Sequence, residues 1–144
     1  MSVLLICERN PAAVSPETSV ADTIRHMLDA GVGAVAVVDS ERVVAGIFTE
    51  RDVLKRVALS GKDPAATPVC ELMTTPVEMA TEQTGEAEAL AVMLERHYRH
   101  LPVVDNQGRL LGMLSIRHVL EARIDELVQQ LDAVQSKTSH RVVG

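Results

Sequence analysis

A chain of 144 residues with a formal net charge of −6 and 47% hydrophobic residues can form one domain-sized core, or two small modules that share one. With one Tyr, one Phe and no Trp, its core must be aliphatic, which favours a mixed α/β interior and excludes a disordered or fibrous chain. The negative charge argues against general attraction to nucleic acid or to an anionic membrane.

The location of the protein is predicted from three further features. The apolar run at residues 3–7 is too short for the core of a signal peptide and has no basic residues before it. No segment reaches the ~20 apolar residues of a membrane helix. Two cysteines, Cys7 and Cys70, are too few for a disulfide framework or a metal site and suit a reducing compartment. We expect a cytoplasmic protein that binds neither nucleic acid nor membrane.

The first part of the chain predicts a helix, a hairpin and a second helix. The first helix begins near residues 18–19 and ends at Gly31. Residues 34–38 and 43–48 are apolar strands joined by a turn at residues 39–42. The second helix begins at Thr49, and the Gly and Pro residues of segment 60–68 predict a linker. The apolar residues of the first helix, at helical spacing, are Val20, Ile24, Met27 and Leu28.

The same elements recur later in the chain. A shift of 66 residues aligns residues 3–57 with 69–123 without a gap, and 12 of the 55 pairs are identical, about three times the chance value. The second copy therefore predicts a helix at 86–97, strands at 101–104 and 109–114, and a helix from Ser115. Since neither copy would bury enough surface alone, we expect the two to pack sheet to sheet.

The last helix carries a second pattern. Apolar residues are spaced 4, 3, 4 and 3 apart, the a/d spacing of two heptads: Leu120, Ile124, Leu127, Leu131 and Val134. We expect the helix to run to about Val134 and residues 136–144 to form a frayed end. Two heptads are short for an independent coiled coil, so the pattern predicts either packing on the chain's own domain or pairing with a partner.

Two segments of the second copy resemble a known family. Residues 101–105, Leu-Pro-Val-Val-Asp, and residues 108–115, Gly-Arg-Leu-Leu-Gly-Met-Leu-Ser, are similar to the signature of cystathionine-β-synthase (CBS) domains. Residues 77–81 resemble the opening strand of that fold. The first copy matches over residues 10–53, with Ala36 where the family usually has proline. Two copies at a fixed offset make the resemblance specific.

The resemblance implies an α+β fold of two β-α-β-β-α units packed around a pseudo-two-fold axis, followed by a C-terminal helical extension. On this basis we predict CBS unit 1 at residues 3–59, a linker at 60–68, CBS unit 2 at 69–122, and the extension and tail at 123–144. The family also implies clefts between the units that often hold AMP, ADP, ATP, NAD or S-adenosylmethionine. The helical faces of such pairs generally associate, so a homodimer is expected.

The residues Thr49-Glu50-Arg51-Asp52 have two compatible interpretations. From the residues alone, Thr49 and Asp52 predict a capping box at a helix start. The resemblance implies that the Asp52 carboxylate binds the two ribose hydroxyls, and that Thr49 lies near ribose or phosphate. A helix start also offers free N–H groups to a phosphate. We expect a ligand here.

The rest of this first site is expected from both units. Residues 98–100, Tyr-Arg-His, are by themselves typical of a solvated charged turn, but the resemblance places phosphate-binding cations at Arg99 and Arg117. The adenine is expected in an aliphatic slot. The predicted contacts are Ile47, Thr49, Asp52, Val77, Glu78, Arg99, His100 and Arg117.

A second, weaker site is expected in the other copy. His118 replaces the aspartate there, and an imidazole can make one hydrogen bond but cannot bind both hydroxyls of a ribose. The residues predicted for this site are Met113, Ser115, His118 and Arg51.

No catalytic or metal site is predicted. The five histidines lack ligand spacing such as His-Glu-x-x-His, and the chain has no Walker, Gly-x-Ser-x-Gly or Rossmann glycine motif. We expect no resident cofactor. The leading interpretation is a stand-alone regulatory module, not an enzyme, that binds an adenosine nucleotide and signals by a change of conformation or of partner, such as an effector protein. The alternative is a dimerising interaction or scaffold protein whose clefts are empty.

Overall fold

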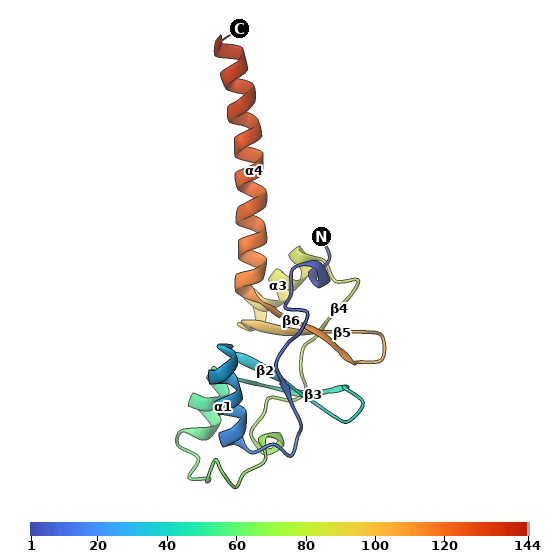
Figure 1. Cartoon of the computed structure of the whole chain (residues 1–144), viewed down its shortest axis with the longest axis vertical. Helices are drawn as coiled ribbons and strands as arrows, with labels where there is room; N and C mark the ends of the chain where they lie inside the picture. Colours follow the sequence, from blue (N-terminus) through green and yellow to red (C-terminus); the bar gives the residue numbers. More distant parts are fainter. Residues whose placement is uncertain (144) are drawn as a thin grey trace.

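Two similar units make up the body of the molecule, and a long helix leaves it (Figure 1). The computed structural model describes the backbone of residues 1–143 and the side chains of residues 1–136. The first unit contains β1 (Ala13–Val14), α1 (Val20–Ala30), β2 (Ala34–Val38), β3 (Val44–Thr49), α2 (Glu50–Asp52) and a turn of π-helix, η2 (Val53–Val57). The second contains β4 (Ala80–Thr81), α3 (Glu86–Arg96), β5 (His100–Val104), β6 (Leu110–Ser115) and α4 (Ile116–Val143). Short 3-10 helices, η1 (Val3–Leu5) and η3 (Val69–Glu71), precede the two units. The predicted α+β class and the β-α-β-β-α order are confirmed.

Helix α1 begins and ends where its sequence predicts. The Ser19 hydroxyl accepts a hydrogen bond from the Asp22 N–H at 3.0 Å, which caps the first turn. Gly31 ends the helix in the left-handed region with φ of 67°. The residue related to Gly31 in the second unit is His97, which holds the same conformation with φ of 60°. A side chain is uncommon in that region.

Each unit forms a three-stranded sheet with the same register. β1 runs parallel to β2, which is antiparallel to β3, and β4, β5 and β6 repeat this arrangement. Val37 lies opposite Gly46, and Val103 lies opposite Gly112, so the 66-residue offset is kept at the level of individual pairs.

Backbone hydrogen bonds between the units follow the same offset. The Ile47 N–H donates to the Thr74 carbonyl at 3.1 Å, and the Thr74 N–H donates to the Ile47 carbonyl at 2.8 Å. Met113 lies 66 positions after Ile47, and Glu8 lies 66 positions before Thr74. The backbone groups of Met113 and Glu8 make the equivalent pair of hydrogen bonds, 2.9 Å long in both directions. This relation is what a pseudo-two-fold axis between the units requires.

The core closes only when both units are present. Between the sheets, Ala34 and Ile47 of the first unit pack with Leu110 of the second, which confirms sheet-to-sheet packing. The segments before the units are exchanged: fully buried Val3 lies in the core of the second unit, and fully buried Val69 lies in the core of the first. Each unit therefore depends on a segment that precedes the other.

Several predicted details are wrong. Only the last two residues of the predicted opening strand 77–81 form β4. The helix after Thr49 changes to a π-helical turn, in which the Ala58 N–H donates to the Val53 carbonyl at 2.9 Å. Leu28, one of the four apolar residues at helical spacing in α1, is 75% exposed.

The predicted end of the last helix is also wrong. α4 continues to Val143, and Gly144 lies outside the described residues. At 28 residues the helix is about 42 Å long and projects away from both units (Figure 1). In the part of the chain that the structure describes, no helix combines the length and the apolar character needed to span a membrane.

Candidate functional site

A cleft of about 560 Å³ lies between the two units. One wall is the end of β3 with the start of α2, and the facing wall is the segment from the end of α3 to the start of β5. Thr74 and residues 76–78, which come after the linker, complete the lining. Seven of the eight residues predicted for the first site line this one cleft: Ile47, Thr49, Asp52, Val77, Glu78, Arg99 and His100.

The start of α2 is a complete capping box. The Asp52 N–H donates to the Thr49 hydroxyl at 3.2 Å. In return the Asp52 Oδ2 atom accepts hydrogen bonds from the Thr49 N–H at 3.0 Å and from its hydroxyl at 3.2 Å. The structural interpretation of these two residues is therefore confirmed.

The other oxygen of Asp52 is also occupied. The Thr74 hydroxyl donates to Oδ1 at 2.8 Å, and the Arg56 Nε atom lies 3.4 Å from the same oxygen. The residue is 4% exposed. Since a carboxylate offers about four acceptor positions, a ribose diol at Asp52 has to replace existing partners rather than fill an empty acceptor.

Basic side chains outnumber acidic ones around the cleft. The acidic residues are Glu50, Asp52 and Glu78. The five basic residues are Arg51, Lys55, Arg56, Arg96 and Arg99, so the formal charge of the lining is +2, with five positive and three negative groups.

Part of this positive charge is available to a ligand. Glu78 pairs with Arg96 at 3.6 Å, and Asp52 pairs with Arg56. Among the residues that the structure describes, neither Lys55 nor Arg99 has an ion-pair partner. The cleft therefore suits an anion, and a guanidinium can bind phosphate oxygens bidentately.

His100, at the start of β5, lies in the same lining. Burial lowers the pKa of its imidazole, the nearby charges of His118 and Arg99 lower it further, and Glu50 opposes them. The neutral form is thus favoured in the absence of ligand. A phosphate placed near Arg99 would favour the protonated form.

Two predicted positions need correction. Arg117 does not line the cleft: its side chain is 79% exposed and its Nε atom lies 3.6 Å from Glu121 Oε1 on the same helix. Arg51, predicted for the second site, lines the first cleft, where its Nη1 atom donates to the His97 carbonyl at 2.9 Å. The residue four positions after Arg51 is Lys55, which repels it, whereas the residue four positions after Arg117 is Glu121, which attracts it.

The second predicted site repeats the capping geometry with an imidazole. The His118 Nδ1 atom accepts from the Ser115 N–H at 3.0 Å, and the Ser115 hydroxyl accepts from the His118 N–H at 3.2 Å. Met113 is 6% exposed and packs between the sheets. The structure therefore joins two of the four predicted residues, Ser115 and His118, in a cap without a carboxylate.

Several residues of the cleft were not predicted. Thr74 reaches Asp52 from the segment after the linker, and no pattern in the sequence indicates this. Arg56 could have been found, because it lies one helical turn after Asp52. His97 lines the cleft in its unusual left-handed conformation, and such residues are enriched at functional sites. Within the described part of the chain no cluster of three metal-binding side chains occurs.

A comparison of the chain with protein-family models identifies its family. The CBS domain model matches residues 5–59 and 69–125. The chain belongs to the CBS domain family. A CBS-domain structure from Burkholderia ambifaria is 36% identical, with a TM-score of 0.78 over 85% of this chain and 91% of that one.

Other CBS proteins are similar over most of the chain. The structure of CBSX2 from Arabidopsis thaliana in complex with AMP is 26% identical, with a TM-score of 0.74 over 86% of this chain and 96% of that one. An uncharacterised 17.7 kDa protein of Acidianus ambivalens is 38% identical over 112 residues, which are 78% of this chain and 66% of that protein. The chain spans 66%, 16% and 62% of three curated relatives that it matches.

Proposed function

We propose that this CBS pair is a regulatory module that binds an adenosine-containing nucleotide in the cleft between its units and responds by a change of conformation or of partner. The observation that carries the proposal is the convergence of Thr49 and Asp52 from one unit with Arg99 and His100 from the other on a single cleft. A ligand that contacts both walls binds best at one separation of the units, so its binding shifts their relative position.

The charge of the lining supports a nucleotide rather than a nucleoside. The formal charge of +2 matches the two negative charges of a nucleoside monophosphate near neutral pH. Arg99 is the principal phosphate ligand in this proposal, and Ile47 and Val77 provide the aliphatic surface for the base. The CBSX2 structure with AMP, 26% identical to this chain, supports the same ligand class. AMP, ADP, ATP, NAD and S-adenosylmethionine all contain the adenosine group that this cleft would recognise.

Regulation rather than catalysis is part of the proposal. The family match covers residues 5–59 and 69–125, and the proposed ligand is a signal rather than a substrate or a resident cofactor. The expected cytoplasmic location stays a prediction, and one Arabidopsis relative, CBSX3, is mitochondrial. We further propose that the active form is a homodimer. This homodimer in turn binds an effector protein.

A thermal-shift screen tests the ligand. AMP, ADP, ATP, NAD and S-adenosylmethionine are compared with adenosine, 2′-deoxy-AMP and GMP as controls. A ligand that binds only the native state at 100 times its Kd stabilises it by about 2.7 kcal/mol, which raises the Tm by several degrees. We expect AMP to raise the Tm more than adenosine or 2′-deoxy-AMP. If no adenosine compound at millimolar concentration changes the Tm, the nucleotide proposal is wrong.

A specific observation favours the alternative, an interaction protein whose clefts are empty. All acceptor positions of Asp52 are already occupied by Thr49, Thr74 and Arg56, so the fold does not need a ligand at this point. In that case the screen gives no shift, while the oligomeric state of the chain is unaffected.

A further inference from the structure

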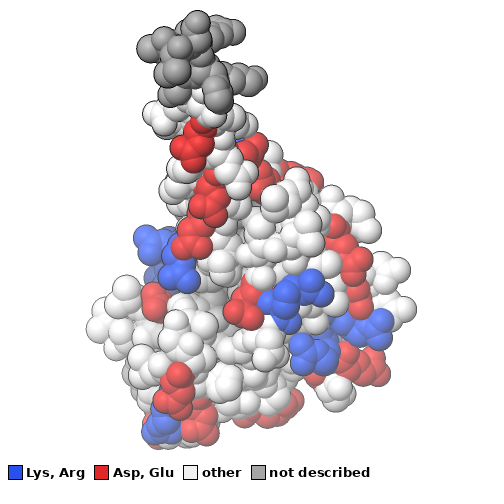
Figure 2. Space-filling model, turned by 45° about the horizontal axis from the view of Figure 1, so that its top comes forward, with Lys and Arg blue, Asp and Glu red and all other residues white. Residues whose placement is uncertain are grey.

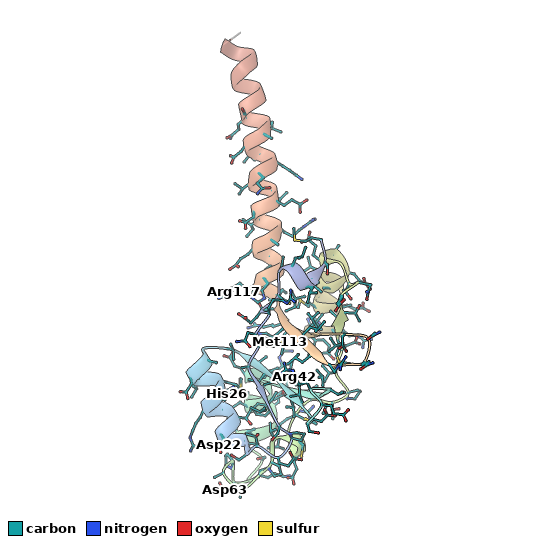
Figure 3. The ribbon with its side chains drawn as sticks, turned by 45° about the vertical axis from the view of Figure 1, so that its right-hand side comes forward. Asp22, His26, Arg42, Asp63, Met113 and Arg117 are labelled. Atoms are coloured by element: carbon teal, nitrogen blue, oxygen red, sulfur yellow. The ribbon has the colours of Figure 1, made fainter. Side chains whose placement is uncertain are left out.

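The projecting part of α4 exposes a continuous apolar seam. Four residues at a/d spacing define what we call the α4 seam: Leu120, Ile124, Leu127 and Leu131, which are 46%, 58%, 60% and 56% exposed. Figure 3 shows the side chains of this helix pointing into open space beyond Arg117 at its base. Exposed aliphatic side chains in such a row are typical of a surface that another molecule covers. The helix does not fold back on its own domain, which was one of the two arrangements expected.

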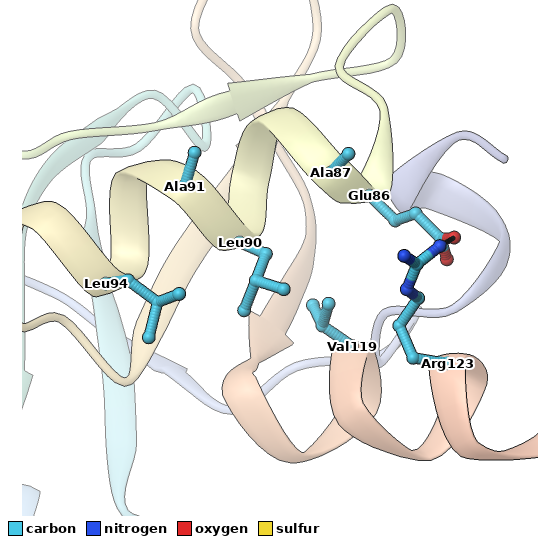
Figure 4. Close-up of a pocket in the computed structure, with 7 residues that line it drawn as sticks. All are labelled: Glu86, Ala87, Leu90, Ala91, Leu94, Val119 and Arg123. Atoms are coloured by element: carbon cyan, nitrogen blue, oxygen red, sulfur yellow. Dashed lines mark ion pairs between the residues drawn. The ribbon is translucent and has the colours of Figure 1, made fainter.

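A shallow groove continues the seam onto the body of the molecule. It has a volume of about 220 Å³ and lies between α3 and the first turns of α4. In Figure 4, Leu90 and Leu94 of α3 point toward α4, and Val119 points back toward α3. Leu94 is 60% exposed. Val119 of this groove directly precedes Leu120, so the groove lies at the base of the α4 seam.

The equivalent face of the first unit is less suitable. Leu28 and Leu54, related to Leu94 and Leu120 by the repeat, are each 75% exposed. However, an exposed ion pair between Arg25 and Asp22, with a distance of 2.6 Å, lies on that face. The helix beside it ends at Val57 instead of continuing as α4 does. The groove of the second unit also has an ion pair, between Arg123 and Glu86 at 3.7 Å, but only the second unit has a helix that carries its apolar residues beyond the body.

The charges along α4 cause no repulsion in a parallel pair with a second copy. Acidic side chains follow the projecting helix on its outer surface (Figure 2), and the residues at positions b and c of the heptads include Asp125, Glu126 and Asp132. In a parallel pair the residues that flank the seam meet across the interface five positions apart. The three contacts are Ile116 with the partner's Glu121, Arg123 with the partner's Val128, and Gln130 with the partner's Gln135. None of these contacts joins like charges.

We propose that two copies of this chain associate through α4 as a parallel two-stranded coiled coil, and that the groove between α3 and α4 forms part of the same interface. The proposal rests on the homodimer proposed above and names its surface. Two heptads alone are short for a coiled coil, which typically needs three or four, so the groove supplies the remaining contacts. A two-fold axis along the helices buries the same surface on both copies.

Light scattering on the full chain at micromolar concentration tests the interface. We expect about twice the chain mass of 15.6 kDa for the unmodified protein. The double variant Ile124→Glu/Leu127→Glu should have the mass of one chain, because it places four buried carboxylates in the seam of a dimer. Gln129→Glu, on the opposite face of the same helix, is the matched control and should remain a dimer. A dimeric double variant, or a monomeric unmodified chain, would overturn the proposal.

Further variants separate this proposal from the others. Leu94→Glu should weaken the dimer, and its repeat-related control Leu28→Glu should not. Equal effects of the two would place the interface elsewhere.

In a Cys70→Ser background, Leu127→Cys should form a disulfide-linked dimer with oxidised glutathione, whereas Gln129→Cys should not. Equal cross-linking of the two, or none at Leu127→Cys, would overturn the parallel pairing. Nucleotide-induced thermal shifts of the monomeric double variant are measured in parallel, so a failure of the nucleotide proposal is seen independently of the interface.

Discussion

Replacing Asp52 by asparagine tests ribose recognition with little change of shape. The carboxylate accepts hydrogen bonds from Thr49 and Thr74, and asparagine retains one oxygen for the Thr49 N–H. Its amide can donate to the Thr74 hydroxyl, which also accepts. Only the ion pair with Arg56 is lost outright, and Arg56 is 48% exposed. We therefore expect a loss of about 1 kcal/mol in the free energy of unfolding.

The effect on nucleotide affinity should be larger. In the proposed complex the two ribose hydroxyls donate to a carboxylate, and asparagine can accept only one of those hydrogen bonds. A hydrogen bond to a charged group contributes about 1.5–3 kcal/mol, so we expect affinity for AMP to fall about 10- to 100-fold. Titration calorimetry measures both the affinity and the number of sites.

The internal repeat provides the matched control. His118 holds the position related to Asp52 and makes the same capping contact with Ser115. His118→Asn should leave affinity for AMP within a factor of about two, because in the proposed complex it contacts no ribose. Similar losses in Asp52→Asn and His118→Asn would refute the assignment of ribose to one capping box.

Three further predictions concern charge, pH and packing. Arg99→Ala should reduce AMP affinity about 10-fold or more and remove the preference for AMP over adenosine. Arg117→Ala changes a side chain outside the cleft and should leave both properties unchanged. Calorimetry at two salt concentrations compares the two variants. Burial lowers the pKa of His100, so below pH about 6.5 the unfolded chain binds more protons than the folded chain. The free energy of unfolding should therefore fall as the pH drops through that range, and it should fall less steeply in His100→Asn. Urea unfolding at several pH values measures both. Gly112→Ala should lower the free energy of unfolding by about 1–3 kcal/mol, since its Cβ would lie 2.7 Å from the Glu8 carbonyl oxygen. Gly46→Ala should lower it less, since the three atoms nearest to its Cβ all belong to the flexible Met73 side chain; thermal melts compare the two.

Most of the fold could be predicted because the chain contains an internal repeat, so each element is indicated by two copies of its sequence pattern. A turn, a glycine or an apolar pair that recurs 66 residues later is a constraint on backbone geometry, as Val37 opposite Gly46 and Val103 opposite Gly112 show. The exchange of the segments at Val3 and Val69 was not predictable in the same way. An apolar residue before a unit has no pattern that says which of two adjacent cores it enters.

The candidate site was predicted less completely, for reasons of side-chain reach. The capping residues and the aliphatic slot follow from backbone position, and the structure places them in one cleft. The direction of a long arginine depends on its neighbours instead: Arg117 turns toward Glu121, whereas Arg51 crosses to the His97 carbonyl. Thr74 enters from a segment outside the repeated elements, so only the folded chain brings it to Asp52.

The divergence of the two copies leads to one last expectation, the number of nucleotides bound. The cleft at Asp52 is lined by five basic and three acidic residues. Moving each lining residue by 66 positions gives the repeat-related residues of the second copy, of which two are basic, Arg99 and Arg117, and two are acidic, Glu8 and Glu121. The backbone is thus repeated while the charge falls from +2 to zero and the ribose carboxylate disappears. Calorimetry should give one nucleotide per chain, and two equivalent sites per chain would contradict this account of how the copies diverged.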